Sequence, residues 1–423
     1  MHSEPTTERA AGYTKISVCR VCGSSALMTF WDAGPLHIVE FPKLGDAPTK
    51  PKVPLQLAVC EKCWLVQLMH TTDPKYLYEE FHYRSGVNEM MRAALASIVN
   101  SALYEVHLAR GDVVVDIGAN DGTLLSFVPE TVRVACEPAK NMYAMVSKYA
   151  EIIIPEFWSG EAYERAFARH SIPVRKAKIV FACAMFYDLE NPVEFCKQVA
   201  KILDKNGVFV VQMNYLPTML SSNGVDNIVQ EHLTYFSLST LIPVFQAAGL
   251  LIYKAETNSV NGGSLRVYAC HAGQRDSDAS VHAILGREYA MGLASLESYF
   301  SFTSRTVGVL STLQKMLDDL SVKHKKVYAY GASTRGTTLL QLLRTDGRLI
   351  ACAERDDRKI GRYMVGANLP IVSEDEFRKE AECGLVLPWH FLGAIQQREK
   401  EWLAKGNQMI VPLPYPRFVV SQS

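Results

Sequence analysis

The stretch Val113-Val-Val-Asp-Ile-Gly-Ala-Asn-Asp-Gly-Thr-Leu-Leu125 decides the fold of this chain. It begins with three β-branched apolar residues before Asp116, which is typical of a buried strand, and it ends as the start of a helix. A strand that passes through a short glycine-bearing turn into a helix lets the backbone approach a ligand closely at the helix N-terminus. The stretch therefore predicts an α/β domain that binds a ligand at the acidic turn, residues 116–122.

The chemistry of the acidic turn differs from that of phosphate-binding loops. The turn is not Gly-x-Gly-x-x-Gly and lacks the Lys-Ser/Thr of a P-loop. Its acids repel a pyrophosphate but suit a ligand with a sulfonium and an amino group, and an acid about 20 residues later can accept both ribose hydroxyls. The pattern favours S-adenosylmethionine (SAM) over a nicotinamide cofactor; the alternative is a turn that only connects strand to helix. The predicted SAM-binding residues are Asp116, Gly118, Asn120, Asp121, Gly122, Glu137 and Pro138.

Strand-like and helix-like stretches alternate along most of the chain, which predicts parallel sheets covered on both faces. A largely helical stretch at 279–323 separates two such series, so we expect a second, smaller α/β domain after it. The expected strands lie at 113–116, 133–136, 179–182, 208–212, 326–330, 349–353, 384–388 and 408–411, and an amphipathic helix is expected at 90–108. The expected domains span residues 1–75, 76–278 and 279–423.

Four of the ten cysteines form two Cys-x-x-Cys pairs in a turn-rich N-terminal segment. Each pair can direct two thiolates at one tetrahedral ion, and four soft ligands leave no position for water, so a structural Zn²⁺ is expected. Chance pairing or a redox dithiol are the alternatives, although a redox motif would be one pair at a βα turn. The predicted ligands are Cys19, Cys22, Cys60 and Cys63.

Composition narrows the class of protein further. The chain has 423 residues, of which 48% are hydrophobic and 21% charged, so it is expected to fold into more than one domain. Lys+Arg and Asp+Glu balance at 44 each, which argues against nucleic acid or anionic lipid as a partner. The polar N-terminus has no secretory pattern and no run is long enough to span a membrane, so we expect a cytoplasmic protein, a monomer or a weak homo-oligomer.

Two further segments carry candidate chemistry. Glu231 and His232 follow an expected strand end, and a carboxylate beside a histidine is a reasonable general base, although a structural pair is as good a reading of these two residues alone. The C-terminal turn, residues 331–336, leads from a strand into a helix, where its amides and Arg335 could receive a diphosphate; the alternative is a turn that only packs. The predicted substrate-binding residues are Ser333, Thr334, Arg335 and His390.

These motifs occur together in an order that resembles one family, the sugar C-methyltransferases acting on carbon 3 of nucleotide-linked 4-keto-6-deoxy sugars. The resemblance covers nearly the whole chain. It rests on the cysteine quartet continuing to Leu68, on the acidic turn, on the Glu-His segment, and on stretches beginning at Tyr83, Ala184, Gly262, Tyr330 and Leu387.

The resemblance implies a class I SAM-methyltransferase Rossmann-like domain, flanked by a zinc-binding lobe and a C-terminal Rossmann-like domain. It also implies that His232, with Glu231 as its partner, removes a proton beside the substrate ketone, and that SAM and a nucleotide-diphosphate sugar are the ligands. Donors near the ketone oxygen would stabilise the developing charge, and Tyr83 is the candidate.

The chain departs from the family pattern before the Glu-His pair, where Val229-Gln230 stands in place of Cys or Tyr followed by His. Asn261 likewise stands where the family often has His before Gly-Gly-Ser. The departures favour, as an alternative, a methyltransferase for another enolisable or hydroxylated small molecule. A third reading is a non-catalytic protein that binds nucleotide sugars, which the intact acidic turn and Glu-His pair argue against.

Overall fold

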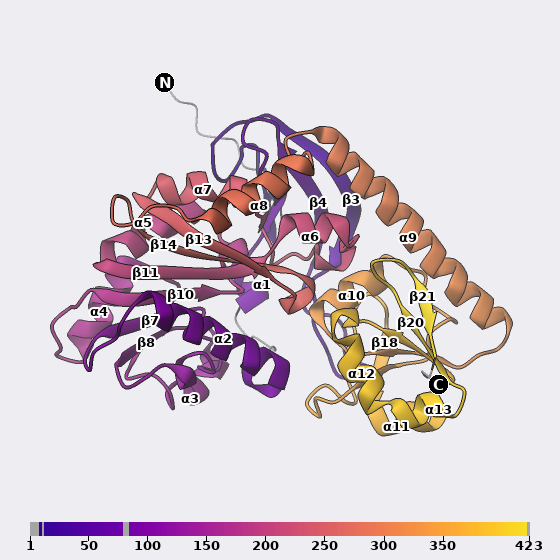
Figure 1. Ribbon diagram of the computed structural model, residues 1–423. Coiled ribbons are helices and arrows are strands. Elements are labelled where there is room, and N and C mark those ends of the chain that lie inside the picture. The colour runs from indigo at the N-terminus through magenta and orange to yellow at the C-terminus, as the bar shows by residue number, and fades with distance from the viewer. Residues whose placement is uncertain (1–7, 11, 79–83, 421–423) are drawn as a thin grey trace.

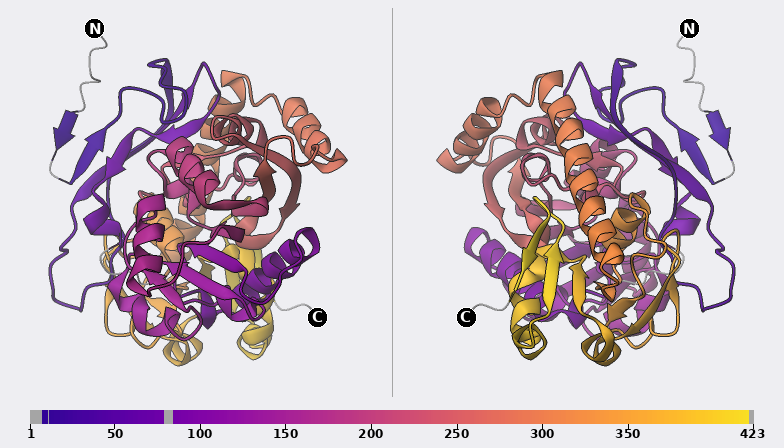
Figure 2. Two further views of the ribbon diagram at one scale, coloured as in Figure 1. Left: turned by 90° about the vertical axis from the view of Figure 1, so that its left-hand side faces the viewer. Right: turned by 90° about the vertical axis from the view of Figure 1, so that its right-hand side faces the viewer.

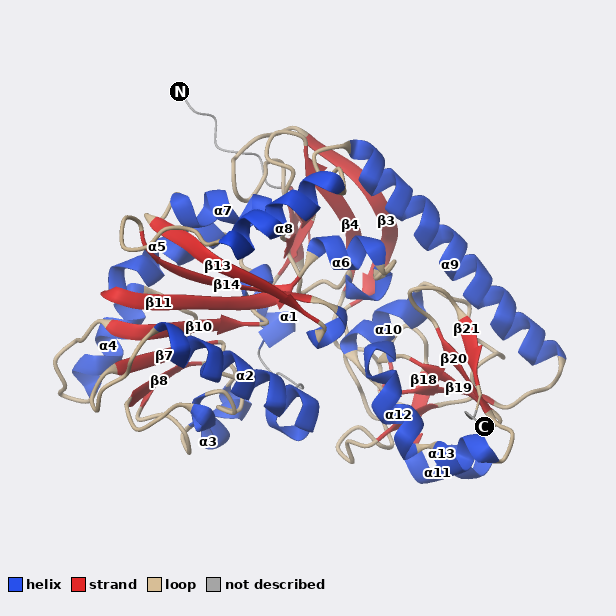
Figure 3. Ribbon diagram, viewed as in Figure 1, coloured by secondary structure: helices blue, strands red, loops and turns tan. Residues whose placement is uncertain are grey.

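The computed structural model describes residues 8–10, 12–78 and 84–420. A large sheet lies at the left of Figure 1, a second sheet lies at the lower right, and N-terminal strands lie at the top. Helices pack against both large sheets, as the colouring in Figure 3 shows. The two side views in Figure 2 place the N-terminal strands along one side of the molecule.

The central sheet has seven strands in the order β13-β14-β11-β10-β7-β8-β9. All neighbouring pairs are parallel except those that β14 makes with β11 and β13, which are antiparallel. Numbered along the chain, this order is 3-2-1-4-5-7-6 with the last strand reversed, the arrangement of class I SAM-dependent methyltransferases, so the predicted fold class is confirmed. The strands are β7 (Val113–Ile117), β8 (Val132–Cys136), β9 (Ile152–Ile154), β10 (Ala177–Cys183), β11 (Leu203–Asn214), β13 (Leu250–Asn258) and β14 (Ser264–His271).

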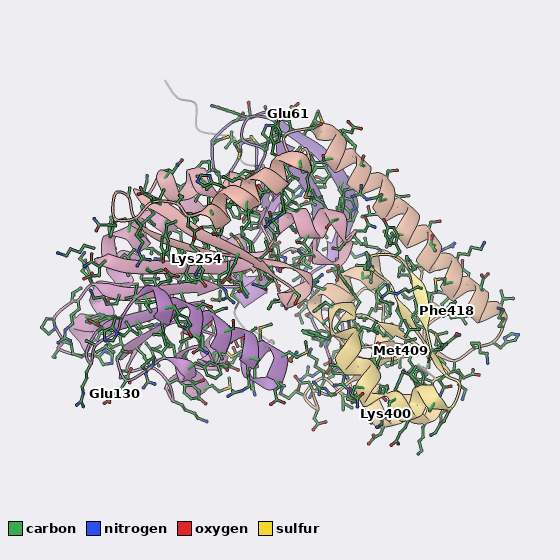
Figure 4. The ribbon with its side chains drawn as sticks, viewed as in Figure 1. Glu61, Glu130, Lys254, Lys400, Met409 and Phe418 are labelled. Carbon is green, nitrogen blue, oxygen red and sulfur yellow. The ribbon has the colours of Figure 1, made fainter. Side chains whose placement is uncertain are left out.

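Helices cover both faces of the central sheet, which is why its strands are apolar on both sides. Val113 and Val115 of β7 belong to one core, and Val114 belongs to the core on the opposite face. Lys254 on β13, labelled in Figure 4, bonds Glu105 at the end of α2 with an N–O distance of 2.8 Å and so fixes that helix on the sheet. The helices are α2 (Glu89–Glu105), α3 (Tyr143–Val146), α4 (Gly160–Arg169), α5 (Pro192–Ile202), α7 (Leu238–Gln246) and α8 (Ala279–Ala290).

Helix α8 packs with the central sheet, because its Val281 and Ile284 belong to the core that contains Val113 and Val115. The buried carboxylate of Glu288 also accepts hydrogen bonds from the hydroxyl of Tyr215 and from the backbone of Leu238 and Ser239 at the start of α7. The expected helical stretch at 279–323 is therefore two helices. The second, α9 (Leu296–Val322), runs along the outer edge of the molecule in Figure 1, from the N-terminal strands toward the C-terminal sheet. We propose that the C-terminal domain begins at α9 rather than at residue 279.

The N-terminal strands form two small sheets. One of them, in the order β12-β5-β4-β3, incorporates a strand from the Glu-His segment, since Thr234 and Tyr235 pair with Gln67 and Val66. The elements are β1 (Glu8–Ala10), β2 (Tyr13–Lys15), β3 (Leu27–His37), β4 (Lys52–Cys60), β5 (Val66–Leu68), β6 (His70–Thr72), α1 (Pro74–Tyr78), α6 (Leu216–Ser221) and β12 (Thr234–Tyr235).

The C-terminal sheet has the order β17-β18-β16-β15-β19-β20-β21, and its strand order reverses between β15 and β19. Open parallel sheets bind ligands at such a reversal, beyond the carboxyl ends of the strands. The strands are β15 (Val327–Tyr330), β16 (Cys352–Glu354), β17 (Tyr363–Met364), β18 (Leu369–Ser373), β19 (Cys383–Val386), β20 (Gln408–Val411) and β21 (Arg417–Val419). The helices are α10 (Thr334–Gln341), α11 (Glu374–Glu380), α12 (Leu392–Arg398) and α13 (Lys400–Ala404).

Single 3-10 turns complete the fold, and several of them border the site described next. They are η1 (Ser85–Val87), η2 (Leu125–Phe127), η3 (Lys140–Met142), η4 (Phe186–Asp188), η5 (Val225–Asn227), η6 (Val260–Gly262) and η7 (Trp389–Phe391).

Candidate active site

A cavity of about 470 Å³ lies between the carboxyl ends of the central strands and the C-terminal sheet. Its volume is in the range of small-molecule binding sites. Three sets of predicted residues meet at its wall, from the acidic turn, the Glu-His segment and the C-terminal sheet. The predicted residues that line it are Gly118, Asn120, Glu137, Pro138, Glu231, His232, Ser333, Thr334, Arg335 and His390.

Two glycines of the acidic turn adopt left-handed backbone conformations, but they face different surroundings. Gly118 (φ 76°) lines the cavity, and a Cβ there would lie 3.0 Å from the Cγ of Met185. Gly122 (φ 81°) faces away from the cavity, and a Cβ there would meet Tyr149 and Val146 at 3.0 and 3.1 Å. Gly118 therefore lies at the wall of the cavity, whereas Gly122 packs against neighbouring side chains away from it.

Glu137, at the end of β8, holds the acidic turn in place and also lines the cavity. One carboxylate oxygen accepts the backbone N–H of Asn120 at 2.7 Å, and the other accepts that of Ala139 at 2.8 Å. A carboxylate oxygen can accept more than one hydrogen bond, so these contacts leave Glu137 able to receive ribose hydroxyls.

Asp121 does not line the cavity. Its carboxylate accepts hydrogen bonds from the Thr123 hydroxyl at 2.6 Å and from the backbone N–H of Gly86 at 2.8 Å. The side chain of Asn120 accepts the N–H of Ser85 at 3.0 Å, next to this contact. The acidic turn therefore anchors the η1 backbone, and Asp121 acts on the cavity through that anchor rather than by direct contact.

Asp116 lies at the end of β7, beneath the turn, with 2% of its surface exposed. Burial, together with the nearby charges of Glu137 and Asp121, raises the pKa of Asp116 to about 8. Three acids around one buried turn raise the cost of negative charge there, and a bound cation would relieve that cost. The surroundings thus fit a ligand that carries positive charge, as the sulfonium and amino groups of SAM do.

His232 is held in one tautomer by the backbone. Its Nδ1 lies 3.0 Å from the carbonyl oxygen of Asn227. A carbonyl only accepts hydrogen bonds, so Nδ1 carries the proton and Nε2 keeps its lone pair. Burial lowers the pKa of His232 to about 3, so the ring is neutral at physiological pH. The partner that orients His232 is therefore Asn227, a role that the sequence analysis assigned to Glu231.

Glu231 belongs to a second group of polar side chains in the cavity, which also includes Asp188, Tyr78 and Tyr187. Burial raises the pKa of Glu231 to about 7, and the Lys50 cation opposes this shift. Burial and the charge of Glu231 together raise the pKa of Asp188. Glu231 is thus a carboxyl that changes charge near neutral pH inside the cavity.

The two departures before the Glu-His pair have different surroundings. Val229 lines the cavity. Gln230 is buried against β3, where its side-chain amide lies 3.4 Å from the carbonyl oxygen of Leu36. Of these two residues only the valine lies at the wall of the cavity, and Asn261, the remaining departure, lines the same cavity.

Arg335, a predicted substrate ligand, lines the cavity but already has protein partners. Its guanidinium bonds the buried carboxylate of Asp226 at 2.9 Å and donates to the carbonyl oxygen of Asn261 at 2.7 Å. Ser333 accepts the N–H of Gly336 through its hydroxyl and so caps α10. Because Asp226 neutralises Arg335, the backbone amides of the C-terminal turn are left to carry much of any anion binding.

Several residues at the cavity were not among the predicted site residues. Asp188 and Tyr187 lie inside the segment that carries part of the family resemblance, but no pattern in the sequence gives them a chemical role. Asp226 and Trp389 do not line the cavity themselves; they are distant in sequence and meet only through folding, with the indole nitrogen 3.0 Å from the carboxylate. The predicted catalytic residue Tyr83 lies outside the described residues.

The four predicted zinc ligands come together at the end of the N-terminal sheet. Their sulfur atoms all lie within 4.8 Å of one another, with Cys19 and Cys63 at 3.6 Å and Cys22 and Cys60 at 3.5 Å. Sulfurs bound at 2.3 Å around one tetrahedral zinc would be about 3.8 Å apart, so the cluster fits Zn²⁺. Glu61, labelled in Figure 4, lies beside them at the top of the molecule.

Comparisons with known proteins agree with this geometry. Residues 259–414 match the family "C-methyltransferase C-terminal domain", and residues 19–78 match the family "Putative zinc binding domain". The C-methyltransferase NovU of Streptomyces niveus is 29% identical over 417 residues, which cover 96% of this chain and 98% of NovU.

Two solved structures are also similar. The plantazolicin methyltransferase BpumL with bound SAH has 12% identity and a TM-score of 0.33, covering 43% of this chain and 84% of BpumL. A SAM-dependent methyltransferase from Clostridium acetobutylicum has 11% identity and a TM-score of 0.31, covering 43% of this chain and 92% of its own.

The fold, the two family matches and the full-length relative define the class of this protein. This chain is a SAM-dependent C-methyltransferase, and its N-terminal segment is similar to a putative zinc-binding domain. Among the described helices, none combines the length and apolar character that a membrane-spanning segment requires.

The cysteine cluster generates a first prediction. Cys60→Ser removes one ligand from a four-sulfur site, so we expect bound zinc to fall from about one ion per chain toward none, as measured by atomic emission. Cys60 ends β4, and β5 connects that hairpin to β12, so loss of zinc should also lower methyl transfer. Cys383→Ala, a buried cysteine on β19, serves as the control and should keep its zinc. Chelated wild-type protein with unchanged thermal stability and activity would contradict a structural zinc.

The two glycines of the acidic turn generate a second prediction. Gly118→Ala forces a left-handed alanine, at about 1 kcal/mol or more, against Met185 in the cavity, so we expect the Kd for SAM to rise about tenfold by calorimetry. Gly122→Ala carries the same backbone cost away from the cavity, so it should lower thermal stability and leave the Kd unchanged. A SAM affinity lost equally in both variants would show that the turn acts as one unit.

Proposed function

We propose that this C-methyltransferase methylates carbon 3 of a nucleotide-linked 4-keto-6-deoxy sugar. The observation that carries the proposal is the single cavity shared by the acidic turn, His232 and the C-terminal turn. SAM bound at the acidic turn would lie on one side, and a nucleotide-sugar diphosphate at the amides that follow β15 would lie on the other. The resemblance to the sugar C-methyltransferases supports this reaction, and the C-methyltransferase relative supports transfer of the methyl group to a carbon atom.

The residues of the acidic turn would hold SAM, which supplies an electrophilic methyl group when bound. Glu137 faces the cavity with capacity for ribose hydroxyls, and a cationic group bound at the turn would lower the raised pKa of Asp116 beneath it and so favour the Asp116 anion. Gly118 and Asn120 let the backbone line the same wall.

His232 is suited to remove the proton from carbon 3, beside the ketone. The bond to Asn227 leaves the Nε2 lone pair as the basic site of a ring that is neutral at physiological pH. The C–H electron pair would move into an enolate as the proton passes to Nε2. Carbon 3 would then use that pair to form the new bond to the methyl group, while the electron pair of the broken sulfur–methyl bond stays with the sulfur of SAM. Asp226, whose charge raises the pKa of His232, would stabilise the imidazolium, and ionised Glu231 would add negative charge to the same cavity.

A second acceptor class has one observation in its favour. Val229 places an apolar side chain in the cavity wall beside Glu231, where the family usually has a cysteine or tyrosine. A less polar enolisable or hydroxylated small molecule would suit that wall, and the same donor site and base would serve it.

The proposed base generates a third prediction. His232→Ala removes the proton acceptor, so we expect kcat to fall by about 10²–10⁴-fold with the Kd for SAM unchanged. The assay uses labelled SAM with TDP- and GDP-linked 4-keto-6-deoxy sugars, and mass spectrometry reports both the methyl group and solvent deuterium at carbon 3. Full transfer and exchange by the variant would refute His232 as the base. No transfer by the wild type to any of these sugars, despite SAM binding, would favour the second acceptor class.

The cavity carboxyl generates a fourth prediction, on pH. The pKa of Glu231 is raised to about 7, so its anion forms as the pH rises through 7, and the rate should rise with it. Glu231→Gln should abolish this rise and hold the rate near the low-pH value. Lys50→Met removes a cation that lowers the pKa of Glu231, so it should shift the rise to higher pH. An unchanged pH–rate profile in Glu231→Gln would exclude this role.

A further inference from the structure

The C-terminal sheet reaches His232 through a buried carboxylate that belongs to the central domain. Asp226 lies in η5 with 1% of its surface exposed. One of its oxygens accepts two bonds from Arg335, at 3.0 and 2.9 Å, and a third from the indole of Trp389 at 3.0 Å. Both donors lie on elements that adjoin the C-terminal sheet, Arg335 at the start of α10 and Trp389 on η7.

Asn227, the residue after Asp226, determines which ring nitrogen of His232 carries the proton. The Asn227 carbonyl oxygen accepts the bond from His232 Nδ1, and the hydroxyl of Tyr235 lies 3.4 Å from the same oxygen. The Asn227 side chain in turn accepts a bond from Asn214 at the end of β11. A shift of the η5 backbone would therefore move the acceptor that selects the His232 tautomer.

The energetics of the Asp226–Arg335 pair argue for a role beyond stability. A buried ion pair often contributes little net stability compared with apolar residues of similar size, whereas loss of one partner leaves a costly uncompensated charge. Such a pair fixes geometry, because its hydrogen bonds are satisfied in only one arrangement. Among the described residues, the second oxygen of Asp226 has no hydrogen-bond partner, so all three bonds depend on one atom.

We propose that Asp226 is a positioning residue that couples docking of the C-terminal sheet to the orientation of His232. Arg335 and Trp389 fix the Asp226 side chain, the η5 turn fixes the Asn227 carbonyl, and that carbonyl keeps Nε2 of His232 free for the reaction. The C-terminal sheet thus completes the catalytic geometry as well as offering a substrate surface. The catalytic part of this inference rests on the proposed function, while the orientation of His232 can be observed without substrate.

The charges around His232 agree with this coupling. Asp226 raises the pKa of His232 and Arg335 lowers it, which places both groups within electrostatic reach of the ring. The rings of Tyr187, with its centroid at 4.2 Å, and Tyr235, at 6.4 Å, also face His232 among the described residues.

The fifth prediction is tested with Asp226→Asn, which keeps an oxygen acceptor for Arg335 and Trp389 but removes the charge. In protein labelled with ¹⁵N-histidine, the wild-type ring of His232, assigned with His232→Ala, should be protonated at Nδ1 only. In Asp226→Asn we expect a mixture of tautomers, together with a fall in kcat of about tenfold or more and little change in KM for TDP-4-keto-6-deoxyglucose. Unchanged tautomer and kcat would overturn the proposal.

A matched control breaks a different contact between the same two parts of the chain. Asn223 donates to the carbonyl oxygen of Pro414 at 3.0 Å and has a left-handed backbone (φ 51°) that glycine adopts freely. Asn223→Gly should lower thermal stability while leaving the His232 tautomer and kcat as in the wild type. An equal loss of tautomer and kcat in this control would show that any weakening of the interface has the same effect, and it would overturn a specific role for Asp226.

A double variant separates positioning from charge. Asp226→Leu with Arg335→Met removes both charges, so thermal stability should recover relative to Asp226→Leu alone. If Asp226 acts by positioning His232, the tautomer mixture and the low kcat should persist in the double variant. Their return to wild-type values would overturn the proposal. If His232→Ala retains full activity, the proposed base is wrong, and the ¹⁵N spectra still decide whether Asp226 orients the ring.

Discussion

A buried connection with little regular secondary structure must find partners for its polar groups on other elements, and that constraint governs the segment at 223–235. The N-terminal lobe satisfies one end, where Leu68 donates to the carbonyl of Leu233 and β5 pairs with β12. The C-terminal sheet satisfies the other end through the bonds of Arg335 and Trp389 to Asp226. The segment that carries His232 therefore has a defined shape only when all three parts of the chain are folded around it.

Because of this arrangement, the cysteine cluster would also affect catalysis. The cysteines fix the turn between β4 and β5, and β5 is the strand against which β12 aligns, two residues after His232. A zinc ion bound by the cysteines would thus stabilise the segment that contains His232, the proposed base. The N-terminal lobe and the C-terminal sheet act on His232 from opposite sides, each by backbone or hydrogen-bond contacts rather than by supplying a reacting group.

The same kind of hydrogen bond, from a turn amide to a carboxylate, occurs in each of the two large sheets. In the central sheet, Glu137 at the end of β8 accepts the N–H of Asn120 in the turn after β7. In the C-terminal sheet, Glu354 at the end of β16 accepts the N–H of Ala332 in the turn after β15, at 2.9 Å. A carboxylate that satisfies turn amides fixes a glycine-bearing turn at the edge of the sheet, with its backbone presented to a ligand.

Features that depend on local patterning could be predicted from the amino-acid sequence alone. β-branched runs predicted the central strands, the acidic turn after Val115 predicted the ligand edge, and the spacing of Cys19 and Cys22 predicted a metal knuckle, since each depends on neighbours in the chain. Only the tertiary structure decided that α8 packs on the central sheet, that Asn227 rather than Glu231 orients His232, and that Arg335 is neutralised by Asp226, 109 residues away. Hydrogen bonds between distant residues depend on how the sheets dock, and no local periodicity carries that information.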